Sequence, residues 1–115
     1  MTRQTRPISW IKAARKDFAD FPEGARLALL RALTLAAAGG KADNAKPLQG
    51  FESGILEIAL PFRGDAYRVV YAVQVGDDLW VLHAFQKKSK SGIKTPKSEI
   101  DLVRTRLKRL KELLS

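Results

Sequence analysis

Apolar and polar residues follow two different spacings along this chain, helical in the first third and strand-like in the middle. Residues 7–10 predict a short strand, and two helices are expected over residues 13–21 and 23–38. The second helix carries one apolar stripe, made of Leu27, Leu30, Leu33 and Ala37. Gly39-Gly40 follows, which suits the end of a helix. The stripe predicts that this helix buries these four side chains.

Three strands are expected after a loop over residues 41–54. Apolar runs at 55–62, 67–75 and 79–86 are joined by short turns, which predicts an antiparallel meander. Thr95 and Pro96 then suit the N-cap and first position of a final helix. Its apolar positions are Ile100, Val103, Leu107, Leu110 and Leu114. Residues 1–115 therefore predict one α+β domain with a short N-terminal strand, two helices, a three-stranded meander and a C-terminal helix.

Charge narrows the classes of partner. The 21 Lys and Arg residues outnumber the 12 Asp and Glu residues, which gives a formal net charge of +9. Such an excess favours nucleic acid, an anionic membrane surface or an acidic protein. No apolar run approaches the roughly 20 residues of a membrane span, and the first residues lack the apolar centre of a signal peptide. Because the chain has no cysteine, it fits a reducing compartment, and we expect a cytoplasmic protein without a membrane partner.

The positive charge is concentrated after the third predicted strand. No Asp or Glu occurs between Leu79 and Ser98. The same stretch contains Lys87, Lys88, Lys90, Lys94 and Lys97. A surface cluster of one sign attracts a polyphosphate, whereas ordinary surfaces mix both signs.

The meander brings further cations to this cluster. Its first turn, the start of its second strand and the end of its third strand share one end of the sheet. If residues 76–78 set the register, Arg68 lies opposite Gln86, within one residue. Arg63 and Arg68 are therefore predicted to converge with Lys87 and Lys88.

Arg68 has two possible anionic partners. It interrupts an apolar run, and a partly buried cation requires a neighbouring anion. That anion is either a bound phosphate or a structural carboxylate, for which Glu57 and Asp65 are candidates. The sequence leaves both possibilities open.

The chemistry available to such a cluster is metal-independent cleavage of RNA. The chain has a single histidine and no clustered set of metal ligands, so neither a metal nor another cofactor is expected. RNA carries its own nucleophile, the 2′-hydroxyl, and needs a base, a leaving-group acid and cations around the phosphate. Crowded lysines lose protons more readily, while arginine remains charged and grips phosphate.

Several landmarks in this order resemble the RelE/ParE toxin superfamily, in its phage-derived HigB-type branch. They are Phe21-Pro22, Lys46-Pro47-Leu48, Leu56-Glu57, the run from Tyr67 to Tyr71, Leu82-His83-Ala84-Phe85, Lys87-Lys88 and Thr95-Pro96. The resemblance covers nearly the whole chain. It implies a RelE-like fold and the toxin of a type II toxin–antitoxin system. It also implies a ribosome-dependent mRNA endoribonuclease and a separately encoded antitoxin, often with a helix-turn-helix domain. The charge of this chain suggests that the antitoxin has an acidic segment.

The resemblance also suggests roles for individual residues. Arg68 is similar to a phosphate-contacting arginine, Lys87 or Lys88 to a cation that ends the next strand, and His83 to a further family position. We expect a catalytic set that consists of Arg68, Lys87, Lys88 and His83. We expect RNA to be bound by Arg63, Tyr67, Lys90 and Lys94. Core packing is the alternative for Tyr67 and His83. Two other functions remain open: a ParE-like gyrase inhibitor, and a non-catalytic, basic co-repressor that binds nucleic acid.

Overall fold

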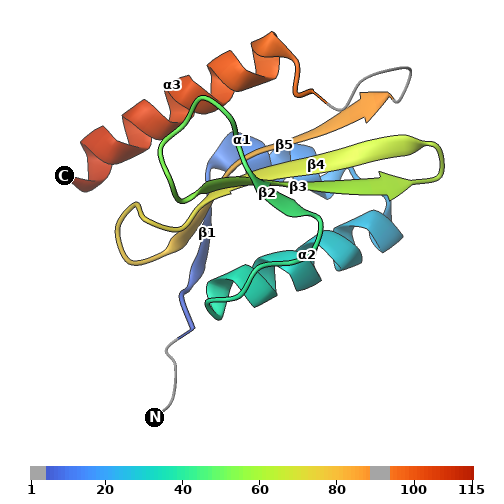
Figure 1. The fold of residues 1–115 in the computed structure, drawn as a ribbon, viewed down its shortest axis with the longest axis horizontal. Helices are drawn as coiled ribbons and strands as arrows, with labels where there is room; N and C mark the ends of the chain where they lie inside the picture. Colours follow the sequence, from blue (N-terminus) through green and yellow to red (C-terminus); the bar gives the residue numbers. More distant parts are fainter. Residues whose placement is uncertain (1–4, 89–93) are drawn as a thin grey trace.

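The computed structural model describes residues 5–88 and 94–115 and has one five-stranded sheet between two helical layers (Figure 1). The elements in chain order are β1 (Ile8–Trp10), α1 (Lys12–Ala19), α2 (Glu23–Ala37), β2 (Ala45–Pro47), β3 (Ile55–Phe62), β4 (Asp65–Ala72), β5 (Leu79–Lys88) and α3 (Lys97–Leu114). The strand order is β1-β5-β4-β3-β2. Strand β1 pairs parallel with β5, and the other pairs are antiparallel.

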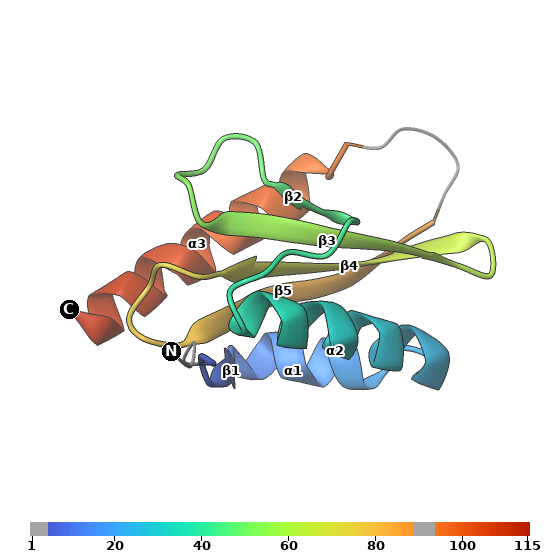
Figure 2. The same cartoon turned by 60° about the horizontal axis from the view of Figure 1, so that its bottom comes forward.

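The two faces of the sheet are covered by different helices. Helices α1 and α2 lie on one face and α3 crosses the other, as Figure 2 shows. Alternate residues of β4 therefore belong to different cores, with Tyr67 and Val69 facing α1 and α2, and Val70 facing α3. Within the described residues, no helix combines the length and apolar character that crossing a membrane requires.

The predicted meander is present with the expected register. Arg68 lies opposite Phe85 and Tyr67 opposite Gln86, within one residue of the prediction. Strand β5 contains a β-bulge, because Val70 pairs with His83 while Tyr71 pairs with Val81. The extra residue is Leu82, so Leu82 and His83 both face α3.

The turns and helix ends follow from local sequence. Arg63 and Gly64 join β3 to β4 with φ values of 52° and 87°, the pair of positive φ angles found in type I′ hairpins. Gly39 has a φ of 95° at the end of α2. The Gly39 and Gly40 amides donate to Ala36 and Leu35, which completes a Schellman motif.

Three expectations about the fold were wrong. The predicted loop over 41–54 contains β2, which pairs with β3. Thr95 does not cap α3: Pro96 occupies the N-cap position, and the Thr95 hydroxyl donates to Glu57 instead. In α2, Leu33 and Ala37 are buried, but Leu27 and Leu30 are 53% and 37% exposed. That helix buries its alanine-rich side, because small residues let it approach the sheet closely.

Candidate functional site

A buried carboxylate on β3 organises the α3 face of the sheet. Glu57 Oε1 accepts a hydrogen bond from Arg68 Nη1 at 2.8 Å, and both side chains are at most 10% exposed. The other oxygen of Glu57 accepts the Thr95 hydroxyl, also at 2.8 Å. Glu57 lies opposite Val70 and Arg68 opposite Ala59, so the ion pair runs diagonally across two strands. Both carboxylate oxygens are therefore held in place.

Glu57 opens onto a groove between β2 and the start of α3. The groove has a volume of about 460 Å³. Its other lining residues are Lys46, Pro47, Leu48, Gln49, Lys94, Thr95 and Ile100. Lys46 and Lys94 are exposed, and Glu57 is the one carboxylate among the lining residues. A bound anion would meet two lysines there, beside a group that can accept a proton.

Lys87 reaches toward this groove from the end of β5. Its ammonium group donates to the backbone carbonyl of Lys94. Lys88 lies opposite Asp65 in the sheet, and Lys90 lies outside the described residues. The structure thus brings Lys87 and Lys94 together near Glu57 and Arg68, as the meander predicted for Lys87.

Arg63 and Tyr67 do not join this group. Arg63 is exposed at the hairpin turn, with its guanidinium 5.1 Å from the centre of the Phe62 ring. Tyr67 is 7% exposed on the opposite face of the sheet. There its ring packs against the ring of Phe21, with the two ring centroids 4.9 Å apart. Core packing, the alternative considered for Tyr67, is what the structure shows.

His83 lies beneath α3 and is 3% exposed. Its Nδ1 is 3.0 Å from Arg106 Nη1, and its Nε2 is 2.6 Å from Glu99 Oε1. Because the guanidinium can only donate, Nδ1 accepts and the Nε2 hydrogen points at Glu99. The ring also stacks on Phe85 with centroids 5.0 Å apart. His83 therefore anchors α3 to the sheet and does not line the Glu57 groove.

Burial and neighbouring charges act on Arg106 in opposite directions. Desolvation lowers the pKa of its guanidinium, while the negative charges of Asp17 and Glu99 oppose that change. Arg106 Nη1 also donates to the Leu82 carbonyl at 3.0 Å. Across residues 5–88 and 94–115, no three His, Cys, Asp or Glu side chains are grouped so that they could hold a metal ion.

Comparison with known proteins identifies the family. Residues 16–108 match the family described as phage derived protein Gp49-like, which is most of the chain. The protein belongs to this Gp49-like family. It is also similar in structure to a chain of the toxin–antitoxin complex RelBE2 from Mycobacterium tuberculosis, with a TM-score of 0.52 and 17% sequence identity. That similarity covers 74% of this chain and 94% of the other. No curated protein sequence matches the chain.

These comparisons confirm two predictions made from the sequence. The Gp49-like family bears out the phage-derived resemblance, and the structural similarity bears out the RelE-like α+β fold. At 17% sequence identity, this similarity shows the fold alone. Any chemistry of this protein has to be argued from its own residues.

Sequence reasoning did not assign two of the charged groove residues, Glu57 and Lys46, to the site of this Gp49-like protein. Both belong to landmarks of the family resemblance, but Glu57 was otherwise considered as a structural partner of Arg68, and Lys46 was placed in a loop. The signal for Glu57 was present, because it is the one charged residue in the apolar run over 55–62. Lys46 gave no such signal, since a three-residue strand containing a proline has almost no pattern of its own.

Proposed function

We propose that this protein is the toxin of a type II toxin–antitoxin pair and that it cleaves mRNA on the ribosome without a metal ion. Family membership and the likeness to a chain of a toxin–antitoxin complex support the first part. The observation that carries the second part is the Glu57 carboxylate, held by Arg68 and Thr95 at a groove lined by lysines.

In this proposal a single RNA strand enters the groove with its phosphates near Lys46 and Lys94. Glu57 takes the proton of a 2′-hydroxyl, the 2′-oxygen attacks phosphorus, and the bond to the 5′-oxygen breaks. Lysines at the end of β5, Lys87 and Lys88, stabilise the negative charge that develops on the phosphate, and one of them returns a proton to the leaving oxygen. No metal ion or other cofactor takes part.

Arg68 has two roles in this reaction. Its hydrogen bond fixes the direction of the Glu57 carboxylate, and its positive charge adds to the field at the phosphate. Arginine suits both roles because its guanidinium stays ionised and donates through several N–H groups. We give His83 no chemical step, since it is buried under α3.

The partners follow from the same proposal. The protein acts in the cytoplasm on ribosome-bound mRNA. A separately encoded antitoxin, with a helix-turn-helix domain and an acidic segment, covers the lysine-rich end of the sheet and silences it.

A non-catalytic function is the second candidate, and the burial of Arg68 and His83 favours it. Arg68 is 6% exposed, so a protein that only binds nucleic acid through its outer lysines would have the same interior. The ParE-like alternative would inhibit gyrase by protein contact alone.

Induced expression of the chain in a bacterial host tests these alternatives together. We expect arrest of growth and translation, with mRNA cut at discrete positions when 5′ ends are mapped. The Glu57→Gln variant is the inactive control, and Lys108→Ala, on the outer face of α3, is the matched active control. Arrest with intact mRNA and altered DNA supercoiling would identify the gyrase mechanism. If the cells grow normally while soluble expression of the protein is verified, the proposal that it is a toxin is wrong.

A further inference from the structure

The turn between β3 and β4 holds one residue in an unfavourable backbone conformation. Arg63 has a φ of 52° and is the one non-glycine residue with a positive φ among residues 5–88 and 94–115. A type I′ turn favours Asn, Asp or Gly at this position, because longer side chains are strained on a left-handed backbone. Strain of this kind persists where another requirement outweighs it, and it is concentrated at sites that bind ligands.

Arg63 rests on an aromatic ring that the fold holds in place. Its side chain is exposed, and its guanidinium lies 5.1 Å from the centre of the Phe62 ring. The Phe62 ring packs against the Tyr67 ring, with the two centroids 6.1 Å apart. On its other side lies Gly24, where a Cβ would be only 2.9 Å from the Phe62 ring. The ring is therefore a fixed platform that directs the guanidinium.

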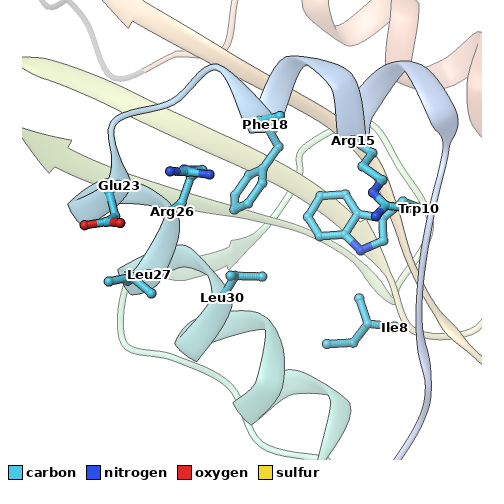
Figure 3. Close-up of a pocket in the computed structure, with 9 residues that line it drawn as sticks. Ile8, Trp10, Arg15, Phe18, Glu23, Arg26, Leu27 and Leu30 are labelled. Atoms are coloured by element: carbon cyan, nitrogen blue, oxygen red, sulfur yellow. The ribbon is translucent and has the colours of Figure 1, made fainter.

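Two carboxylates that could neutralise Arg63 have other neighbours. Asp65 accepts a hydrogen bond from Gln86 Nε2 at 2.7 Å. Glu23, at the start of α2, lines a separate hollow between β1, α1 and α2 together with Arg26 (Figure 3). None of the ion pairs between the described residues involves Arg63. The positive charge of this arginine is thus held by a ring and presented to solvent.

The turn lies at the lysine-rich end of the sheet but outside the Glu57 groove. Ala66, just after the turn, pairs with Lys87 of β5. At about 3.3 Å per residue, β3 places Arg63 about 20 Å from Glu57. One phosphate cannot reach both residues. The hairpin extends past the ends of α2 and α3 in both views of the fold (Figures 1 and 2), so a large partner can approach it.

We propose that Arg63 binds an RNA phosphate outside the cleavage groove. The inference rests on the proposed function, because it gives the protein a second contact with the RNA that it acts on. A guanidinium can grip a phosphate through two N–H groups while its face stays stacked on a ring. Asn suits the turn better than Arg, but Asn cannot make this contact. The phosphate belongs either to a distant part of the mRNA strand or to ribosomal RNA, and the chemistry is the same for both.

The contact between Arg63 and Phe62 also has a purely structural explanation, which predicts a different result. If attraction between the guanidinium and the ring is the reason for the arginine, Arg63→Asn should lower the midpoint of thermal unfolding and leave RNA affinity unchanged. If Arg63 binds RNA, Arg63→Asn should relieve the strain, raise the midpoint and weaken binding.

The test measures binding of RNA that cannot be cleaved, made of 2′-O-methyl nucleotides, both free and as mRNA on ribosomes. For Arg63→Asn we expect the dissociation constant to rise by about tenfold, since a charge-assisted contact is lost. The slope of log affinity against log salt should become shallower by about one. With cleavable mRNA on ribosomes, KM should rise while kcat stays near the wild-type value. Arg63→Lys should restore the salt slope but only part of the affinity.

Arg109→Gln, which removes an exposed charge from α3, is the matched control and should stay near the wild type in affinity and slope. A loss confined to ribosomes would assign the phosphate to ribosomal RNA, and an equal loss with free RNA would assign it to the mRNA strand. Wild-type affinity and slope of Arg63→Asn in both assays would overturn the contact and leave the proposed function standing. If the wild-type protein cleaves no mRNA, the proposed function fails, and the binding data still decide the role of Arg63.

Discussion

Arg68 on β4 and Glu57 on β3 form a buried ion pair at 2.8 Å, and Thr95 holds the second oxygen of the same carboxylate. The pair lies beneath the start of α3 at the edge of a cationic groove. Two readings of this arrangement differ in what Glu57 does. It either neutralises Arg68 inside the fold or accepts a proton from RNA.

Glu57→Gln separates these readings. We expect cleavage of mRNA on programmed ribosomes to fall by about 10²-fold or more, because the amide cannot act as a base. The same change removes the carboxylate that pairs with Arg68, and breaking a buried pair costs about 3–5 kcal/mol. The Glu57→Gln/Arg68→Met variant should regain thermal stability without regaining cleavage. A stable double variant that cuts at the wild-type rate would make the ion pair purely structural.

Arg68→Ala should also reduce cleavage by about 10²-fold, since it removes a positive charge that stabilises the transition state. Arg68→Lys should restore little, because an ammonium cannot hold the carboxylate as the planar guanidinium does. Thermal melting of each variant distinguishes a folding defect from a chemical one. Lys108→Ala is the control and should lose only weak, non-specific RNA affinity. If the folded Arg68→Ala variant cleaves mRNA at the wild-type rate, the active site lies elsewhere.

For His83 we predict a loss of stability without a loss of cleavage, the opposite of the outcome expected for Arg68. His83→Ala leaves Glu99 and Arg106 without their shared partner under α3, so the midpoint of thermal unfolding should fall. The rate of cleavage, measured well below that midpoint, should stay near the wild-type value. A folded variant that no longer cuts would return His83 to the catalytic set.

Stability at alkaline pH depends on Tyr71. Burial raises the pKa of its hydroxyl above the ordinary value of 10.0. The folded protein therefore favours the neutral phenol of Tyr71. The contribution of this phenol to the free energy of unfolding is complete below pH 10.0, the pKa in the unfolded chain, and declines as the pH rises through the higher pKa of the folded protein. Tyr71→Phe should show a smaller loss of unfolding free energy between neutral and alkaline pH. Parallel curves for both proteins would count against a perturbed Tyr71.

Association with the antitoxin should slow as salt rises. The lysines at the end of β5 and in the groove attract an acidic segment over long range, and salt screens that attraction. Stopped-flow mixing at several ionic strengths measures the rate. A rate that does not change with salt would exclude electrostatic steering at this surface.

Much of the fold could be predicted because it depends on local spacing. The turns and alternation in residues 55–86 fix an antiparallel meander, so the approach of Lys87 to Arg68 followed from topology alone. Periodicity showed that α2 has an apolar stripe but could not show which side meets the sheet. Leu27 and Leu30 were therefore placed in the core, and the alanines that pack there were overlooked.

The candidate site was harder to predict because its parts come from distant segments. Glu57 meets Arg68 through strand pairing, which the sequence indicated as one alternative. Thr95 meets Glu57 only because α3 crosses the sheet, and its sequence favoured a helix cap. Glu99 and Arg106 reach His83 for the same reason, and a β-bulge turns His83 toward them.

The start of α3 and its middle turns contact the sheet in different proportions of polar and apolar contacts. Near its start, Thr95 and Glu99 make hydrogen bonds to side chains of the sheet. In the middle turns Val103, Leu107 and Leu110 are buried, and the hydrogen bonds of Arg106 to β5 are added to these apolar contacts. Water can replace hydrogen bonds at small net cost, but it cannot replace apolar contacts. The backbone amides of the first turns of α3 should therefore open and exchange with solvent before those of its middle turns, which contain Val103, Leu107 and Leu110. Such openings would uncover Glu57 and His83 transiently while the rest of the domain stays folded.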